Sequence, residues 1–476
     1  MPASPFLNRA RELAWLEQGS ASPTAQFRVL YGRRRVGKSA LLDEFARGKR
    51  HVLYQAVEGS AADQLRDLTA AILATEDDAG LRAAPLANWD AAFAHLARMA
   101  TAGPLLVIFD EYQYAAESDP TLASRLQRWW SREASELPLY MVLCGSYVRF
   151  FVRSVLAGPA YGRNTGSLQL RPLDYRQAAL FFPDWSPEDR IRAYAVTGGI
   201  PHYLLQFTAH RSLPWNIAHN VLQRGAVLYQ EAELLVREEL REPRVYYSIL
   251  RAMSDGLTRV SDITARVRGA AGGSDLSAYL TTLQDLELAE YVRPVVGDSI
   301  RRGIWTVSDP YLRFWFRFVL PHRRRLEHGV DVERFYADVV GPALDHFVSK
   351  PTFEEICRTW ILDQLAAGRW SAIDRVGAWW GPVSAPTRVQ SRRQAEAELD
   401  VIGVAGNRVV VAGEAKWTRE PISFSALNHL REVLQYVPGA NSETELVLFG
   451  RQFEARLKAA AVGERVRLVD AADLYA

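Results

Sequence analysis

The chain has 476 residues, enough for about three domains, and its 48% hydrophobic and 24% charged residues are ordinary for globular proteins. A net charge of only +2 excludes an overall positive field that would by itself indicate nucleic-acid binding. No apolar run approaches the roughly 18 residues of a membrane span, and no signal-peptide pattern is present, so we expect a cytoplasmic protein without a membrane partner. Cys144 and Cys357 lie far apart in apolar segments, which argues for a reducing compartment.

A buried strand is predicted over Phe27–Tyr31 and a helix over Ala40–Phe45. Between them, Gly32-Arg33-Arg34-Arg35-Val36-Gly37-Lys38-Ser39 has the pattern G-x-x-x-x-G-K-S of a phosphate-binding loop. Glycine lets backbone N–H groups turn inward toward phosphate oxygens. We expect Lys38 to reach the β- and γ-phosphates and Ser39 to ligate Mg²⁺. Because Lys38 is one of only five lysines against 52 arginines, a chance match is rare. The segment therefore predicts an ATP site that uses Mg²⁺.

The second nucleotide motif follows a predicted strand of five apolar residues, Leu105–Phe109, of the kind buried on both faces in parallel sheets. Asp110 emerges at its carboxyl end, where it can hold the Mg²⁺ shell, and Glu111 can polarise the attacking water. Together they match a Walker B motif with a catalytic glutamate. The alternative is a core strand that ends in a solvated acidic turn.

A third apolar strand, Leu139–Cys144, leads to Gly145 and Ser146. Ser146 could act on the nucleotide or could simply cap the end of the strand. In the following segment, Tyr161-Gly162-Arg163, the arginine could contact the γ-phosphate in cis or in trans. With so many arginines in the chain, an ordinary surface role for Arg163 is an equally good explanation.

Three segments carry a family resemblance: Phe6-Leu7-Asn8-Arg9 with Glu12-Leu13, the phosphate loop from Tyr31 to Ser39, and Gly198-Gly199-Ile200-Pro201-His202-Tyr203. Together they resemble the prokaryotic archaeal ATPase family, in the STAND branch of the AAA+-like P-loop enzymes. The resemblance implies that residues 6–13 pack near the adenine, that Ser146 senses the γ-phosphate, and that Pro201 belongs to a helical lid over the nucleotide. From the residues alone, Pro201 indicates only a turn that begins a helix.

The middle of the chain predicts a winged helix, with helices beginning at Val245, Val260 and Asp275, followed by strands over Leu288–Val292 and Gly303–Val307. Winged helices often place their third helix in a DNA groove. This one carries Asp275 and other acidic residues and no Lys or Arg between positions 269 and 292, and acidic groups repel phosphate. We therefore favour a protein-facing or lid-coupling role.

Two basic clusters nearby are better candidates for phosphate contacts. Arg301-Arg302 lies in the predicted wing, and His322-Arg323-Arg324-Arg325 follows it. Their alternative explanation is a solvated basic face.

The C-terminal part predicts a β-hairpin, with strands over Glu398–Val404 and Val409–Lys416 around a Gly406-Asn407 turn. The spacing of two residues puts Glu414 and Lys416 on one face of their strand, and the hairpin brings Asp400 close. This constellation, with Trp379-Trp380-Gly381 before it, resembles the PD-(D/E)xK nuclease fold, and such a domain commonly ends archaeal-type ATPases of this length.

The chemistry of such a site follows from its residue types. Carboxylates of Asp400 and Glu414 would hold Mg²⁺, and Lys416 would position the attacking water. Glu354, on a helix before the hairpin, fits an additional acidic metal ligand. One alternative is a surface hairpin in which Lys416 forms an ion pair with Asp400 or Glu414. Another is the same fold without catalysis.

The sequence thus predicts an α/β chain: a P-loop ATPase core over residues 1–173, a helical lid over 174–240, a winged-helix domain over 241–325 and a restriction-endonuclease-like domain over 335–476. Our leading hypothesis is an ATP-controlled enzyme that processes DNA. The rival hypothesis is an ATP-dependent switch in which a winged-helix scaffold recruits a partner or regulates DNA and the C-terminal domain only binds. A protein partner or a second copy of the chain is a further candidate for what the protein binds.

Overall fold

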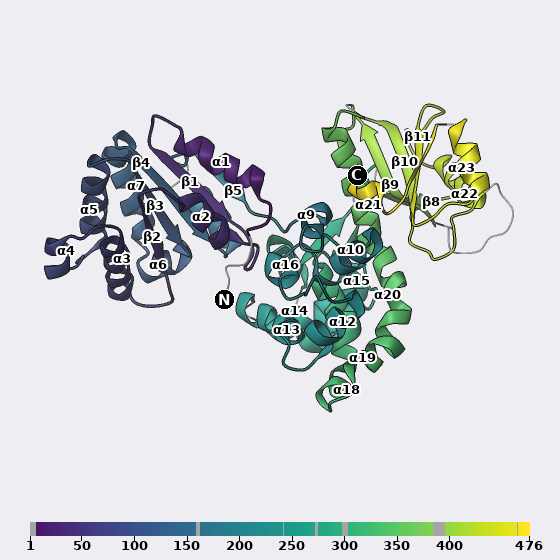
Figure 1. The fold of residues 1–476 in the computed structure, drawn as a ribbon, viewed down its shortest axis with the longest axis horizontal. Coiled ribbons are helices and arrows are strands. Elements are labelled where there is room, and N and C mark those ends of the chain that lie inside the picture. Colours follow the sequence, from purple (N-terminus) through teal and green to yellow (C-terminus); the bar gives the residue numbers. More distant parts are fainter. Residues whose placement is uncertain are drawn as a thin grey trace. The chain divides into compact units, whose positions relative to one another are not determined.

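The computed structural model describes residues 6–158, 162–240, 242–271, 275–297, 303–370, 372–383, 396–463 and 465–476. The chain forms two compact units (Figure 1). The first comprises Met1–Leu173 with Ile200–His202, and the second comprises Asp174–Gly199 with Tyr203–Ala476. Among the described residues, none of the helices has the length and apolar character that crossing a bilayer requires.

The first unit is built on a five-stranded parallel sheet in the order β2-β3-β4-β1-β5. The strands are β1 (Gln26–Tyr31), β2 (His51–Gln55), β3 (Leu105–Asp110), β4 (Leu139–Gly145) and β5 (Gly166–Gln169). All residues of β3 and β4 are buried, as their apolar runs require in a sheet covered on both faces. Because β4 lies between β1 and β3, the carboxyl end of β4 separates the phosphate loop from the Walker B residues.

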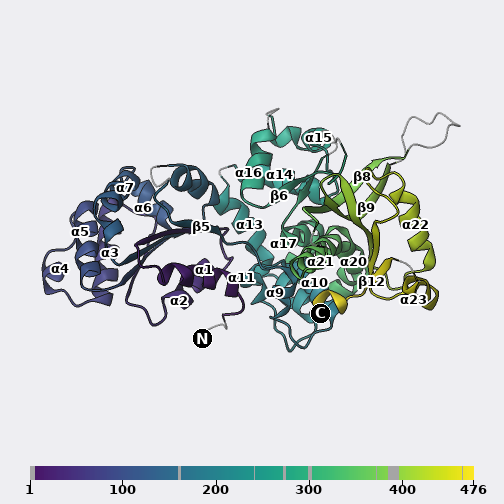
Figure 2. The same cartoon turned by 90° about the horizontal axis from the view of Figure 1, so that it is seen from above.

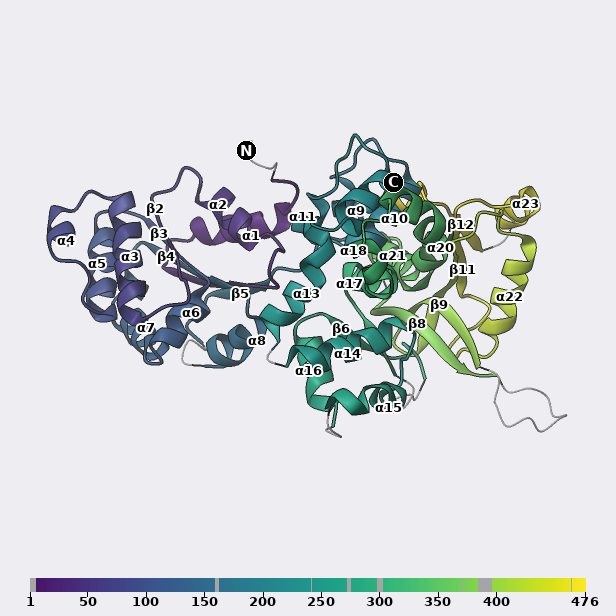
Figure 3. The ribbon, with the colours of Figure 1, turned by 90° about the horizontal axis from the view of Figure 1, so that it is seen from below.

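Helices cover both faces of this sheet. They are α1 (Ala10–Ser20), α2 (Lys38–Ala46), α3 (Ala61–Thr75), α4 (Ala79–Ala83), α5 (Trp89–Thr101), α6 (Tyr112–Ser118), α7 (Leu122–Arg132) and α8 (Val148–Phe150). Helices α3, α5, α6 and α7 share one hydrophobic core with the sheet, and α1 and α2 lie on the opposite face from α6 and α7 (Figures 2 and 3). The strands and the helix predicted around both nucleotide motifs are confirmed, and α2 begins at Lys38 itself.

The second unit begins with short helices and a three-helix segment. The helices are α9 (Tyr175–Ala179), α10 (Pro187–Thr197), α11 (Pro201–Leu204, shared with the first unit), α12 (Leu213–Ile217), α13 (Val227–Glu239), α14 (Pro243–Ser254), α15 (Val260–Ala271) and α16 (Ser277–Asp285). Strands β6 (Ala289–Val292) and β7 (Ile304–Val307) then pair antiparallel. The three helices and the hairpin stand in the predicted order, while their assignment to a winged helix remains a prediction. Arg301 and Arg302 lie outside the described residues.

Six helices lead from the hairpin into and around a second sheet: α17 (Pro310–Phe314), α18 (Arg323–Glu327), α19 (Val332–Phe335), α20 (Gly341–Phe347), α21 (Glu354–Ala366) and, later, α22 (Phe424–Leu434). The sheet has the order β12-β11-β10-β9-β8 and is mixed, because β8–β9 and β9–β10 pair antiparallel while β10–β11 and β11–β12 pair parallel. Its strands are β8 (Arg375–Pro382), β9 (Glu396–Ala405), β10 (Arg408–Lys416), β11 (Glu445–Gly450) and β12 (Val466–Val469).

The C-terminal sheet lies between α21 and α22 (Figures 2 and 3). Helix α22 and the following α23 (Ala455–Val462) bury Leu427, Leu430 and Leu457 against one face. On the other face, Trp360 of α21 meets Phe449 of β11 with ring centroids 5.6 Å apart. The predicted hairpin is confirmed as β9 and β10, and it forms the antiparallel part of a sheet that is separate from the ATPase sheet.

Candidate functional site

The phosphate loop has the backbone that its glycines allow. Gly37 has φ of 94°, in the left-handed region that favours glycine, and helix α2 begins directly after it. A methyl group on Gly32 would lie 2.3 Å from the carbonyl oxygen of Leu170, so a side chain cannot fit there. Lys38 is buried, and its Nζ donates to the carbonyl oxygens of Gly32 and Arg33 at 3.0 Å each. The ammonium is therefore folded onto its own loop, where phosphate oxygens would replace those carbonyls.

The predicted magnesium residues of the ATP site are in contact. Ser39 Oγ donates to Asp110 Oδ2 at 2.8 Å, although Ser39 lies in α2 after β1, Asp110 ends β3, and β4 separates these two strands. A hydroxyl and a carboxylate that meet beside a phosphate loop are the donor set that Mg²⁺ uses in P-loop enzymes. The residues present thus fit the ion.

Glu111 and Ser146 form a second contact at the same edge of the sheet. One carboxylate oxygen of Glu111 accepts hydrogen bonds from the Ser146 backbone N–H at 3.0 Å and from its hydroxyl at 2.9 Å. Gln113, which the sequence analysis did not single out, also donates to this oxygen. Glu111 has φ of 51°, which aims its side chain toward the end of β4. The predicted catalytic carboxylate is therefore held by the residue that the resemblance gives as the γ-phosphate sensor.

The other residues predicted to bind the nucleotide include Pro201, Arg34, Arg35 and Arg163, and their surroundings differ. Pro201 lies beside the phosphate loop, since a methyl group on Gly37 would be 3.7 Å from its Cγ. Arg34 donates to the Tyr114 hydroxyl at 3.0 Å, and Arg35 has φ of 68° within the loop. Arg163 is exposed before β5, and its contact with phosphate remains a prediction.

Arg9 fixes the phosphate loop from outside, a role that the sequence did not reveal. Its guanidinium is buried and donates to the carbonyl oxygens of Val36 at 2.9 Å and Arg171 at 2.8 Å, and it pairs with Glu12. The family resemblance could have indicated this role, because Arg9 and Glu12 belong to the N-terminal segment that carries it. Arg9 ties the loop to the segment after β5.

Replacing Arg9 by alanine is expected to weaken ATP binding about tenfold and to lower the free energy of unfolding by about 1–3 kcal/mol, because two carbonyl oxygens lose a charged donor. Titration with a fluorescent ATP analogue and chemical denaturation measure the two effects. Arg9→Lys should recover only part of the affinity, since an ammonium does not reproduce the fork of a guanidinium. Unchanged affinity in Arg9→Ala would contradict this role.

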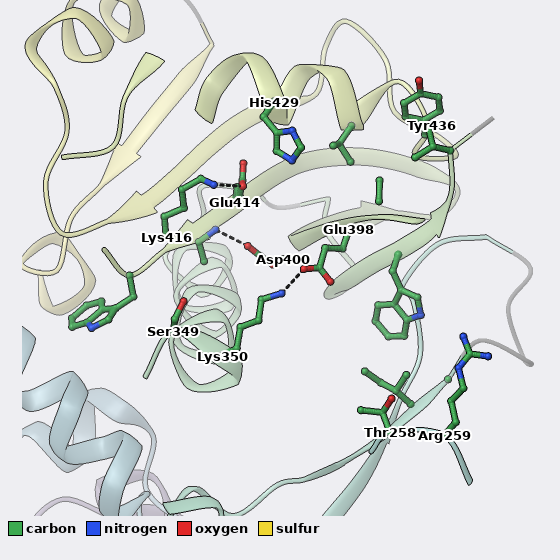
Figure 4. Close-up of a pocket in the computed structure, with 18 of the residues that line it drawn as sticks. Thr258, Arg259, Ser349, Lys350, Glu398, Asp400, Glu414, Lys416, His429 and Tyr436 are labelled. Carbon is green, nitrogen blue, oxygen red and sulfur yellow. Dashed lines mark hydrogen bonds and ion pairs between the residues drawn. The ribbon is translucent and has the colours of Figure 1, made fainter. Parts of the chain in front are cut away.

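Of the residues predicted for the C-terminal site, Asp400, Glu414 and Lys416 line one cavity of about 1100 Å³ (Figure 4). The register pairs Gly413 of β10 with Val401 of β9, so Glu414 and Asp400 are the next residues on the two strands. Lys416 Nζ lies 2.7 Å from Glu414 Oε1, and Asp400 Oδ2 accepts the Ala415 backbone N–H at 2.9 Å. The structure thus brings Asp400, Glu414 and Lys416 together.

Glu354 begins helix α21, is buried, and lies beside Lys350, which lines the cavity. Burial and the neighbouring Asp400 raise the pKa of Glu354 to about 8, against the opposing effect of Lys350. Burial also raises the pKa of Asp400, while the hydrogen bond from Ala415 works in the other direction. Two carboxylic groups that are costly to ionise, close together, need a cation if both are to carry charge.

The residues at this second site are of the types that bind a metal ion, but their positions do not all match the predicted ion site. Within the described ranges, no group of three or more His, Cys, Asp or Glu is close enough to hold an ion, so Asp400, Glu414 and Glu354 are not gathered as predicted. Glu414 is drawn to Lys416, and Glu354 lies 3.4 Å from Lys350. Mg²⁺ keeps several waters and needs only one or two carboxylates. Glu414 Oε2 is buried and accepts no hydrogen bond, which suits an ion-binding role, whereas Glu354 Oε1 accepts none but faces the Lys350 ammonium.

Lys350 and Glu398 also line the cavity, and the sequence analysis missed both. They form an ion pair with one another, and the pKa of Lys350 is raised by Glu354 and Glu398 in spite of its burial. Lys350 is one of only five lysines and stands four residues before Glu354, a helical spacing that could have indicated the contact.

The β6–β7 hairpin packs on the C-terminal sheet. The Val295 backbone N–H donates to the carbonyl oxygen of Ala378 in β8 at 2.9 Å, and Val295 and Val296 contact the hydrophobic core of that sheet. Residues from Thr258 to Ser261 and from the hairpin then line the cavity opposite the carboxylates. The role of this segment, protein-facing or lid-coupling, stays a prediction.

Comparison with known proteins identifies two regions. Residues 6–207 match a family described as an ATPase domain predominantly from Archaea, and residues 315–429 match the family DUF234, described as archaeal and bacterial proteins of unknown function. A relative from Methanocaldococcus jannaschii, named Uncharacterized protein MJECL04, is 26% identical over 382 residues, which cover 79% of this chain and 82% of the relative.

Solved structures that are similar to the chain include two archaeal proteins. The Walker-type ATPase PABY2304 of Pyrococcus abyssi has a TM-score of 0.49 at 21% identity and covers 66% of this chain and 96% of its own. The ORC2 protein of Aeropyrum pernix, in ADPNP and ADP complexes, has a TM-score of 0.40 at 17% identity and covers 71% of this chain and 96% of its own.

Proposed function

Because the chain joins an archaeal-type P-loop ATPase domain to a DUF234 segment, we propose that it is an ATP-controlled, metal-dependent nuclease that acts on DNA. One observation carries the proposal: Asp400, Glu414 and Lys416 meet in a single cavity, and a buried oxygen of Glu414 accepts no hydrogen bond. An ion pair between Lys416 and Glu414 would not by itself explain why Asp400, whose pKa is raised by burial, also lies in this cavity.

In the proposed chemistry, Asp400 and Glu414 would hold the metal ion, and Glu354 would be the additional acidic residue. When bound, Mg²⁺ would lower the pKa of its water and offset charge on the scissile phosphate. The Ala415 N–H fixes the orientation of the Asp400 carboxylate. Lys416 lies within reach of Glu414, so its ammonium can hold a water or a phosphate oxygen beside the carboxylates.

The hydrogen bonds around Asp345 support control of the C-terminal site by ATP. The Asp345 carboxylate accepts hydrogen bonds from Arg192 of α10 at 2.9 Å and from Trp417, which follows Lys416 in the chain, at 3.1 Å. Arg419 and Arg451 also donate to it. Burial opposes the charge, yet these hydrogen bonds lower the pKa of Asp345. Helix α10 ends at Thr197, four residues before Pro201 at the phosphate loop. Movement of Pro201 on ATP binding would therefore act on α10, and through Asp345 on the site.

Replacing Asp345 by asparagine is expected to leave ATP hydrolysis intact and to bring the ratio of cleavage rates with and without ATP close to one, because the neutral amide binds Arg192 less firmly. Parallel assays of phosphate release and DNA cleavage measure both rates. Asp338→Asn, a change at an exposed neighbour, is the matched control and should keep the wild-type ratio. An unchanged ratio in Asp345→Asn would exclude this route.

The proposed function is tested by incubating the full-length chain with plasmid and single-stranded DNA in Mg²⁺ or Mn²⁺. We expect cleavage by the wild type and none by Lys416→Ala. Lys458→Ala, at a lysine of α23 outside the cavity, should cleave normally. Equal cleavage by Lys416→Ala would remove the proposed site.

The alternative function is an ATP-dependent switch whose C-terminal part only binds a partner. The β6–β7 hairpin favours this alternative, because it packs on the C-terminal sheet of the same chain and would then serve as a structural scaffold. Absence of cleavage under every metal condition, together with intact ATP hydrolysis, would favour the switch.

A further inference from the structure

The cavity that holds Asp400, Glu414 and Lys416 is closed on its far side by a different part of the chain. Thr258, Arg259 and Ser261 at the start of α15, with Tyr291 and Ile304 of the β6–β7 hairpin, form the wall opposite the carboxylates. Figure 4 shows Thr258 and Arg259 on one side of the carboxylates and His429 and Tyr436 on the other. A scissile phosphate therefore has to enter between two walls to reach Asp400, which is 8% exposed.

The size of the cavity limits what can enter. A B-form duplex, about 20 Å across with a rise of about 3.4 Å per base pair, fills roughly 1,000 Å³ per base pair. The whole cavity, at about 1100 Å³, is therefore no larger than one base pair of duplex. An unpaired strand needs about half of that volume per nucleotide, so roughly two nucleotides can enter.

The lining offers what an unpaired strand requires. Trp380 and Tyr436 line the cavity with aromatic rings, on which exposed bases can stack, and a duplex would not offer its base faces to them. Arg259 is exposed on the wall opposite the carboxylates, where it can pair with a phosphate next to the scissile one.

From these observations we propose that the substrate of this cavity is an unpaired nucleic-acid strand, such as a single-stranded segment or a frayed end, and not an intact duplex. The inference rests on the proposed nuclease function. It adds a specificity role for Arg259 and Tyr436, neither of which holds the metal ion.

Binding of 5′-fluorescein oligonucleotides to the full-length chain tests the proposal without requiring cleavage. The assay uses fluorescence anisotropy in Ca²⁺, a hard cation that takes the same oxygen ligands. One sequence is offered as single-stranded DNA, single-stranded RNA and blunt duplex DNA. We expect either single strand to bind at least tenfold more tightly than the duplex. Arg259→Ala and Tyr436→Ala should each weaken single-strand binding about fivefold or more, in line with one lost phosphate contact or one lost stacking contact.

Two controls make the result specific to the cavity. Tyr436→Phe keeps the ring and should bind as the wild type does, which separates stacking from a loss of fold. Arg408→Ala, at an exposed arginine at the opposite end of β10, should also bind normally. Duplex binding as tight as single-strand binding, or a single-strand preference that survives both alanine variants, would overturn the inference. Preference for RNA over DNA would keep the inference and contradict the DNA substrate of the proposed function. Absence of cleavage alone would contradict only the proposed function.

Discussion

Replacing Asp400 by asparagine is expected to lower the rate of metal-dependent cleavage by about 10³-fold or more, because the variant removes one of two charged metal ligands. The fold should survive, since the amide oxygen of asparagine can still accept the Ala415 N–H that Asp400 accepts at 2.9 Å. The same variant should lose Mn²⁺ binding measured by electron paramagnetic resonance without nucleotide. Loss of both cleavage and Mn²⁺ binding would assign the effect of the substitution to the metal ion and not to a change in side-chain packing.

The matched control for Asp400→Asn is Glu432→Gln, because Glu432 lines the same cavity but is exposed. It should cleave within about twofold of the wild type, as expected for loss of one well-solvated charge. If Asp400→Asn cleaves as fast as Glu432→Gln, the carboxylate at Asp400 holds no catalytic ion.

Replacing Lys38 by alanine is expected to reduce ATP hydrolysis by about 10²-fold or more, in the range found when a single donor to developing charge is removed. Lys38 is 5% exposed, and its ammonium is already at the loop, bound by the Gly32 and Arg33 carbonyl oxygens. Phosphate release under steady-state conditions gives the rate, and a fluorescent nucleotide gives the affinity.

Lys49 provides the control for this second change. It follows helix α2, which begins at Lys38, and its ammonium contacts Glu17 and the Phe45 carbonyl oxygen instead of the phosphate loop. Lys49→Ala should hydrolyse ATP at close to the wild-type rate. Similar rates for Lys38→Ala and Lys49→Ala would contradict the assignment of the phosphate loop.

Much of the fold could be predicted from the sequence because its motifs are local. The apolar runs before Gly32 and Asp110 can form only buried strands, and the turn at Gly406 fixes the hairpin that carries Asp400 and Glu414. In each case the order of residues along one or two neighbouring strands determines which side chains meet. The contact of Ser39 with Asp110 could be expected for the same reason, since each follows or ends a parallel strand of one sheet.

The remaining features depend on contacts between segments that are far apart in the sequence. Arg9 reaches Arg171, and Val295 pairs with Ala378, and no local pattern encodes either contact. Glu354 pairs with Lys350 and Glu414 pairs with Lys416, and the spacing of carboxylates along the chain did not predict these separate partners. The cavity itself arises because the β6–β7 hairpin packs on β8.

Control of the C-terminal site by ATP is tested by the single-turnover rate of DNA cleavage in Mg²⁺ with and without saturating ATP. The wild type and Lys38→Ala are compared in the same assay. We expect ATP to change the wild-type rate by about fivefold or more and to leave the Lys38→Ala rate unchanged. Cleavage by the wild type at one rate in both conditions would contradict control by ATP, and the absence of any cleavage would contradict the nuclease itself.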